Sequence, residues 1–105
     1  MIFLETPVFT NLLRGSLSDE EYRALQFSLL LRPEQGLLIR GSGGLRKIRW
    51  GAGGGGKRGG YRVIYFWHKA RSKCYMLFLY RKNDQGDLTA AQVRILSRLV
   101  REEFP

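Results

Sequence analysis

Acidic residues are missing from the middle of this chain. Between Gln35 and Asn83 the sequence contains no Asp or Glu, although it contains twelve Lys or Arg. All nine acidic residues of the 105-residue chain lie outside these positions, which we call the acid-free segment. A continuous cationic segment in a small protein predicts a polyanionic partner, and the phosphates of RNA or DNA fit that role best.

Cysteine and histidine are nearly absent as well. A single cysteine, Cys74, excludes an intramolecular disulfide, which fits a reducing cytoplasm. Because it sits within an apolar run, we expect a buried, inert thiol rather than a nucleophile. One cysteine and one histidine, His68, give no ligand cluster, so we expect no metal site and no cofactor. We expect His68 to be a solvated residue at a hairpin turn rather than a catalytic base.

Long apolar runs are also lacking. No segment approaches the roughly 18 to 20 apolar residues of a membrane span, and the N-terminus lacks the basic and apolar regions of a signal peptide. The apolar content of 44% is normal for a folded core, whereas the formal net charge of +9 is unusually high. We therefore expect one domain over residues 1–105, no membrane contact and a nucleic-acid partner.

Hydrophobic periodicity and capping signals predict an α+β fold of the order β-α-α-β-β-β-α. The predicted sheet is small and mainly antiparallel, with about four strands, two N-terminal helices and one C-terminal helix. Ser18 with Glu21 and Thr89 with Gln92 form two capping boxes that mark helix starts. The strands are expected at residues 2–4, 45–50, 61–67 and 74–80, and the helices at 6–13, from 18 to before Pro33, and from 89 onward.

The glycine run at residues 51–60 resembles phosphate-binding loops only superficially. Gly51, Gly56 and Lys57 match the start of a Walker A loop, but Arg58 stands where Ser or Thr should hold magnesium. The run also leads into a predicted strand instead of a helix. It is therefore interpreted as a flexible hairpin loop or as a mobile basic flap that orders on RNA.

Strand alternation indicates which cations can converge. Lys47 and Arg49 are two residues apart and project from one face of their strand, whereas Arg46 projects from the other. Pairing of the strands could bring these two residues together with Arg62 and Lys82. We call Lys47, Arg49, Arg62 and Lys82 the cationic cluster.

Such a cluster suits the cleavage of RNA without metal. In that reaction the 2′-OH attacks its own phosphate, and Arg and Lys stabilise the extra negative charge. Crowded lysines lower one another's pKa, so one of them could act as a base. The same residues could instead bind phosphate without catalysis, and the residue types alone favour that simpler interpretation.

Four sequence blocks resemble the HigB branch of the RelE/ParE toxins. They are residues 43–49 (GGLRKIR), 56–65 (GKRGGYRVIY), 79–83 (LYRKN) and 87–89 (DLT). The blocks occur together and in order, and the similarity runs from about residue 3 to 103. The resemblance implies a bacterial, cytoplasmic type II toxin that cuts messenger RNA in the ribosomal A site. It also implies a cognate HigA-like antitoxin with a helix-turn-helix, which neutralises the toxin and represses the shared operon.

The resemblance also implies roles for individual residues. The cationic cluster matches the family's catalytic positions. RelE proper has a base-stacking tyrosine shortly after the last strand, but residues 85–89 contain no aromatic residue here. Stacking would therefore have to come from Tyr80 or Trp50. The residues expected to contact RNA or the ribosome are Arg46, Lys57, Arg58, Tyr80 and Arg81.

Two other functions remain open at this point. A toxin of the same fold could act on DNA gyrase, as on the ParE side of the superfamily. Alternatively, the chain could be a non-catalytic module that binds RNA or DNA. The apolar residues Leu37, Leu38 and Ile39 could dock an antitoxin, although a buried edge strand would explain them equally well.

Overall fold

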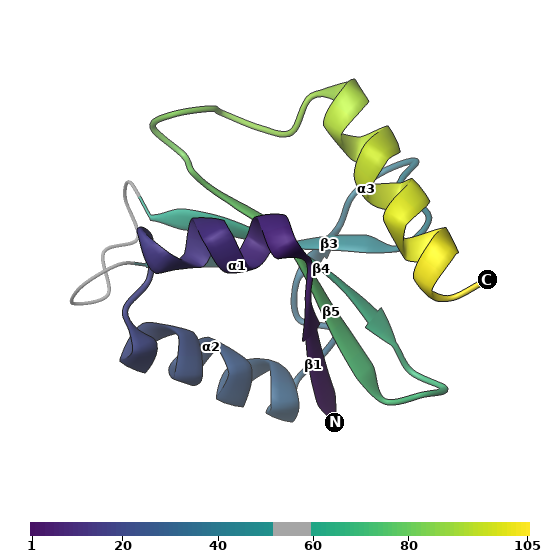
Figure 1. The fold of residues 1–105 in the computed structure, drawn as a ribbon, viewed down its shortest axis with the longest axis horizontal. Coiled ribbons are helices and arrows are strands. Elements are labelled where there is room, and N and C mark those ends of the chain that lie inside the picture. The colour runs from purple at the N-terminus through teal and green to yellow at the C-terminus, as the bar shows by residue number, and fades with distance from the viewer. Residues whose placement is uncertain (52–59) are drawn as a thin grey trace.

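The computed structural model describes residues 1–51 and 60–105 of the chain. The described residues form five strands and three helices (Figure 1). In chain order they are β1 (Ile2–Glu5), α1 (Pro7–Arg14), α2 (Asp19–Leu31), β2 (Leu37–Leu38), β3 (Leu45–Trp50), β4 (Tyr61–His68), β5 (Lys73–Arg81) and α3 (Ala90–Glu103).

The strands form one mixed sheet in the order β1-β5-β4-β3-β2. Only β1 pairs in parallel, with β5, and the other neighbours are antiparallel. The predicted α+β class and the order of the main elements are confirmed. The sheet has five strands instead of about four, because Leu37 and Leu38 pair with β3 as a short outer strand. The glycine run expected to form a loop falls largely outside the described residues.

The two faces of the sheet carry different helices. In Figure 1, α1 and α2 lie together, and α3 lies apart from them. Along β4, Val63 and Tyr65 pack in the core under α1 and α2, whereas Ile64 packs in the core under α3. This alternation is the period of two that a strand imposes on its side chains. We call the two sides of the sheet the α1/α2 face and the α3 face.

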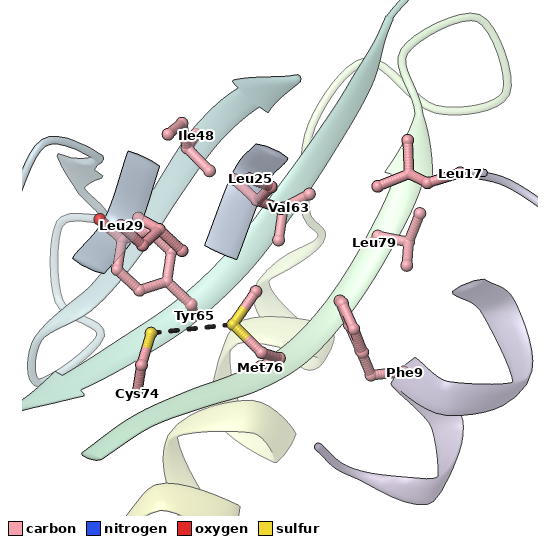
Figure 2. Close-up of a cluster of buried hydrophobic side chains, with 10 residues drawn as sticks. All are labelled: Phe9, Leu17, Leu25, Leu29, Ile48, Val63, Tyr65, Cys74, Met76 and Leu79. Atoms are coloured by element: carbon pink, nitrogen blue, oxygen red, sulfur yellow. Dashed lines mark hydrogen bonds between the residues drawn. The ribbon is translucent and has the colours of Figure 1, made fainter. Parts of the chain in front are cut away.

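The core on the α1/α2 face is the larger of the two (Figure 2). Cys74 is fully buried there, with its Sγ 3.7 Å from Met76 Sδ, and burial raises the pKa of the thiol to about 12. The expected burial of the Cys74 thiol is therefore confirmed. Tyr65 extends from this core: its hydroxyl donates to Pro33 O at 2.8 Å and accepts from Gly36 N at 2.9 Å. A Cβ at Gly36 would come within 2.8 Å of the Tyr65 ring, so only glycine fits this approach.

The core on the α3 face is the smaller of the two and extends along β5 to Tyr80. Leu45, Ile64 and Leu77 pack against Leu96 and Val100 of α3. A register shift between Ile64 and Tyr65 adds one residue to β5 relative to β4. Further along, Phe104 at the end of α3 stacks on Phe66, His68 and Tyr75.

Side-chain caps begin all three helices. Thr6, Ser18 and Thr89 each accept a hydrogen bond from a backbone N–H of the first helical turn. Both predicted capping boxes are present, with Glu21 and Gln92 reaching back to their cap residues. The second box fixes where the loop after β5 enters α3, and this loop borders the site described next.

Candidate functional site

The alternation of side chains along β3 determines on which face of the sheet the first two residues of the cationic cluster lie. Leu45 packs under α3, so Lys47 and Arg49 lie on the same α3 face, further along the strand. Arg62 likewise shares a face with Ile64 on β4. The sequence-predicted convergence of these three cations is therefore consistent with the faces that the structure assigns.

The register of the sheet sets the cations in rows across the strands. Arg49 of β3 pairs with Arg62 of β4, and Arg62 pairs with Tyr80 of β5. The backbone N–H of Lys82 bonds to Gly60 O at 3.2 Å, which continues the β4–β5 ladder to two positions beyond this row. By contrast, the row at the other end of the strands is apolar and lies beneath the end of α3. The cationic cluster is thus at the opposite end of the strands from the row beneath Phe104.

Arg62 is the unusual member of the cluster because it is buried. Only 7% of the residue is exposed, and its Nη1 atom makes no hydrogen bond within the described part of the chain. A buried guanidinium without a partner is unfavourable, since the lost hydration is not replaced. Arg49, opposite it, is exposed. An incoming phosphate could supply the missing acceptor, because guanidinium binds phosphate oxygens in a charge-assisted geometry.

Tyr80 requires a correction to the sequence interpretation. The residue is 6% exposed and its hydroxyl is buried without a well-formed hydrogen bond, so its ring is not available to stack on an RNA base. Burial, followed by the charge of Asp87, raises the pKa of Tyr80 to about 12. The neutral phenol beside Arg62 is suited to donate a hydrogen bond to an anion. Trp50 is also unsuited to stacking, because its Nε1 donates to Glu21 O at 2.9 Å and it packs with the core of the α1/α2 face.

Asp87 is a site residue that sequence reasoning missed. Its Oδ1 lies 3.2 Å from Lys47 Nζ and accepts the Leu88 backbone N–H at 2.8 Å. These contacts, the backbone hydrogen bond first, hold the pKa of the carboxyl below its usual range. The acid-free segment lacks carboxylates in sequence, but in the folded protein the loop after β5 brings the Asp87 carboxylate next to Lys47. The DLT block was the only available signal, and strand alternation cannot place a loop residue.

The other predicted RNA-binding residues are not all near the cluster. Arg46 lies on the opposite side of β3 from Lys47, and its Nη1 donates to Glu34 O and Gly36 O at 2.9 and 2.8 Å. Arg46 thus holds the turn before β2 by hydrogen bonds and lies away from the cationic cluster. Arg81 is exposed at the end of β5. Lys57 and Arg58 lie outside the described residues.

His68 differs from the expectation in one respect. Its Nδ1 accepts the Arg71 backbone N–H at 3.2 Å, as suits a turn residue, but the ring is half-buried against Phe104 instead of solvated. It lies at the far end of β4 from Arg62. In the ranges that the structure describes, no three His, Cys, Asp or Glu side chains are grouped to hold a metal ion.

Apolar surface is exposed at several places outside the cluster, including one strand and one groove. Leu37 and Leu38 of β2 are 73% and 63% exposed, so this outer strand is not a buried edge. A second apolar region is a groove of about 200 Å³ between α1 and α3, floored by β5. It is lined by Thr6, Val8, Leu77, Phe78, Gln92, Ile95, Leu96 and Leu99.

Two N-terminal helices, a mixed sheet and a C-terminal helix over half of one face define an α+β fold of the RelE type. One solved structure with this fold is the E. coli toxin RelE, determined in the free state as a double Arg→Ala mutant. It matches with a TM-score of 0.60 at 15% sequence identity, over 92% of this chain and 93% of that chain. At this identity the likeness establishes the fold and not the chemistry. No protein-family model matches the chain.

The length and hydrophobicity of the helices show whether any of them could span a membrane. Over residues 1–51 and 60–105, none is both long and apolar enough to cross a bilayer.

Proposed function

We propose that this protein is the toxin of a type II toxin–antitoxin system, of the HigB branch, and that it cleaves messenger RNA on the ribosome. The observation that carries the proposal is the buried Arg62, whose Nη1 has no partner in the described residues and which lies between Arg49 and Tyr80 in one row. A folded protein retains a buried unpaired cation at a functional site more readily than elsewhere. The RelE fold and the four sequence blocks support the same assignment.

Each member of the cluster has a role in this proposal. The RNA 2′-OH attacks the adjacent phosphorus, the P–O5′ bond breaks, and the products carry a 2′,3′-cyclic phosphate and a 5′-OH. Arg62 binds a non-bridging oxygen and stabilises the charge that develops in the transition state. Arg49, Lys47 and Lys82 add positive charge and orient the neighbouring phosphates. Tyr80 donates a hydrogen bond from its neutral hydroxyl.

The proposal includes partners and a place. The substrate is messenger RNA in the A site, and the surface of the ribosome is a polyanion that matches a protein of net charge +9. A HigA-like antitoxin with a helix-turn-helix neutralises the toxin and acts in the bacterial cytoplasm. The exposed Leu37 and Leu38 provide one apolar surface that such a partner could cover.

The decisive experiment compares Arg62→Ala with the wild-type protein in a purified translation system, with cuts mapped on a defined transcript. We expect cleavage to fall by about 10²- to 10³-fold, the effect of removing one transition-state donor. Arg62→Lys keeps the charge but not the planar fork, so only part of the activity should return. Arg71→Ala, an exposed arginine in the β4–β5 connection, is the matched control and should cut normally.

Other outcomes point to the alternatives. If wild-type protein leaves transcripts intact but traps DNA gyrase on DNA, the gyrase-directed function replaces this one. If it binds ribosomes in a steeply salt-dependent way without cutting or arresting growth, it is a non-catalytic binding module. Full cleavage by Arg62→Ala, in protein shown to be folded by circular dichroism, would mean that the site is elsewhere.

A further inference from the structure

The Asp87 carboxylate reaches residues on both sides of Arg62. It forms an ion pair with Lys47 of β3 at 3.2 Å, and it is close enough to Tyr80 of β5 to contribute to that residue's raised pKa. In the sheet, β3 and β5 are the two neighbours of β4, which carries Arg62.

The position of Asp87 is fixed by its own loop. Its Oδ1 accepts the Leu88 N–H at 2.8 Å, and its backbone O accepts Gln85 Nε2 at 2.8 Å. Gln85 Nε2 also donates to Gln92 Oε1 at 2.9 Å, and Gln92 belongs to the capping box that begins α3. The carboxylate is therefore tied to the start of a helix that is packed on the sheet, although 70% of the Asp87 side chain is exposed.

We propose that Asp87 is a positioning residue of the cleavage site, which holds the Lys47 ammonium in the cationic cluster, close to Tyr80. The inference rests on the proposed function. Asp87 itself does not contact the scissile phosphate and acts through Lys47. A lysine side chain loses substantial rotamer freedom when it is fixed, so a partner that fixes it beforehand reduces the cost of reaching the transition state.

A simpler effect of Asp87 would have the opposite sign. A carboxylate beside the cluster repels phosphate, so its removal would strengthen RNA binding and raise kcat/KM. Two observations favour positioning. Asp87 makes specific hydrogen-bonded contacts instead of only lying nearby, and its exposed side chain weakens a through-space repulsion by solvent and salt.

The first test is the cleavage kinetics of Asp87→Asn on ribosomes. We expect kcat to fall about tenfold with KM nearly unchanged, and Asp87→Glu to restore part of the loss. Asp84→Asn, in the same loop, removes an exposed carboxylate that makes no side-chain contact with the cluster and should behave as wild type. Because Asp87 acts through Lys47, adding Asp87→Asn to Lys47→Ala should cause much less than a further tenfold loss.

The second test needs no enzymatic activity. Tyr80 can be titrated by NMR with labelled tyrosine and assigned with Tyr80→Phe. The Asp87→Asn change should shift its pKa down from about 12, whereas Asp84→Asn should not. An unchanged Tyr80 titration would overturn the inference even if cleavage were affected.

The outcomes separate the inference from the proposed function. If the wild type cuts and Asp87→Asn cuts equally well or better, the positioning role fails while the proposed function stands. If wild-type protein and Arg62→Ala are equally inactive on ribosomes, the proposed function fails and the positioning role fails with it.

Discussion

Arg62 and Val63 are neighbours in β4, but their side chains lie on opposite faces of the sheet and have different surroundings. Val63 is fully buried in the α1/α2 face, in a core whose one tyrosine hydroxyl, that of Tyr65, is hydrogen-bonded to Pro33 O and Gly36 N. Arg62 is almost as deeply buried on the α3 face, but its Nη1 atom has no hydrogen-bond partner in the described residues, and Arg49 lies opposite it. The α1/α2 face is packed as a core, whereas the α3 face carries a buried cation with an unpaired nitrogen. Sites that conflict with stability in this way are commonly functional.

The largest test of this contrast is a truncation in the core of the α1/α2 face. Leu25 of α2 is fully buried, so Leu25→Ala should lower the free energy of unfolding by about 2 to 5 kcal/mol. Leu31 lies on the same helix but is 66% exposed, and Leu31→Ala should change stability by less than about 0.5 kcal/mol. Urea denaturation of both variants measures the difference. Equal losses would show that α2 does not pack as described.

A smaller loss is expected for Tyr65→Phe. The change removes a hydroxyl that joins Pro33 O and Gly36 N, and the Gly36 N–H is left buried without its acceptor. We expect a cost of about 1 to 3 kcal/mol by urea denaturation. Tyr75→Phe is the control on the α3 face: the Tyr75 hydroxyl makes no hydrogen bond in the described residues, so stability should barely change. A similar loss in both variants would contradict the role of the Tyr65 bridge.

Cys74 makes stability depend on pH. Its pKa is raised by burial from 9.0 to about 12, so the unfolded chain loses the thiol proton first as the pH rises. This contribution to stability is intact below pH 9 and is lost as the pH rises toward 12. Between pH 8 and 10 we expect a loss of about 1.4 kcal/mol. Cys74→Ala should lack that part of the decline, and two identical pH profiles would show that the thiol is not responsible.

The smallest effect on stability is expected at Arg49. The side chain is exposed on the α3 face, so Arg49→Ala should change the free energy of unfolding by less than about 0.5 kcal/mol. Cleavage should nevertheless fall about tenfold, because a positive charge beside the scissile phosphate is lost. Thermal denaturation and the ribosomal cleavage assay on one protein preparation measure both quantities. If Arg49→Ala lowered the free energy of unfolding as much as Leu25→Ala, Arg49 would contribute to the core, and the contrast between the two faces of the sheet would be wrong.

Most of the fold could be predicted because local rules determine it. Ser18 and Thr89 marked helix starts that the structure confirms, and alternation assigned Lys47 and Arg49 to one face of β3. The two-residue β2 could not be predicted with the same rules, since two residues carry no periodicity. The parallel pairing of β1 with β5 depends on a contact between distant parts of the chain, which no local pattern contains.

Of the candidate site, only the shared face of the strand cations could be predicted from the sequence. Alternation brought together the strand residues, whereas Asp87 reaches the cluster through the path of a loop, which tertiary packing determines. The burial of Tyr80 was missed because a tyrosine at a strand end reads equally well as exposed or covered. Arg46 was assigned to RNA by its charge alone, but the backbone carbonyls of Glu34 and Gly36 already use its guanidinium.

The parallel edge strand has a consequence for how the protein is made. Thr6 Oγ1 donates to Leu77 O at 2.8 Å across 71 residues of sequence, and β1 pairs with β5 and not with any earlier strand. During synthesis, β1 therefore has no partner until β5 has left the ribosomal exit tunnel. Closing so long a loop is entropically costly and slow. The nascent chain should thus acquire its native sheet only after β5 has been synthesised and has emerged from the ribosome.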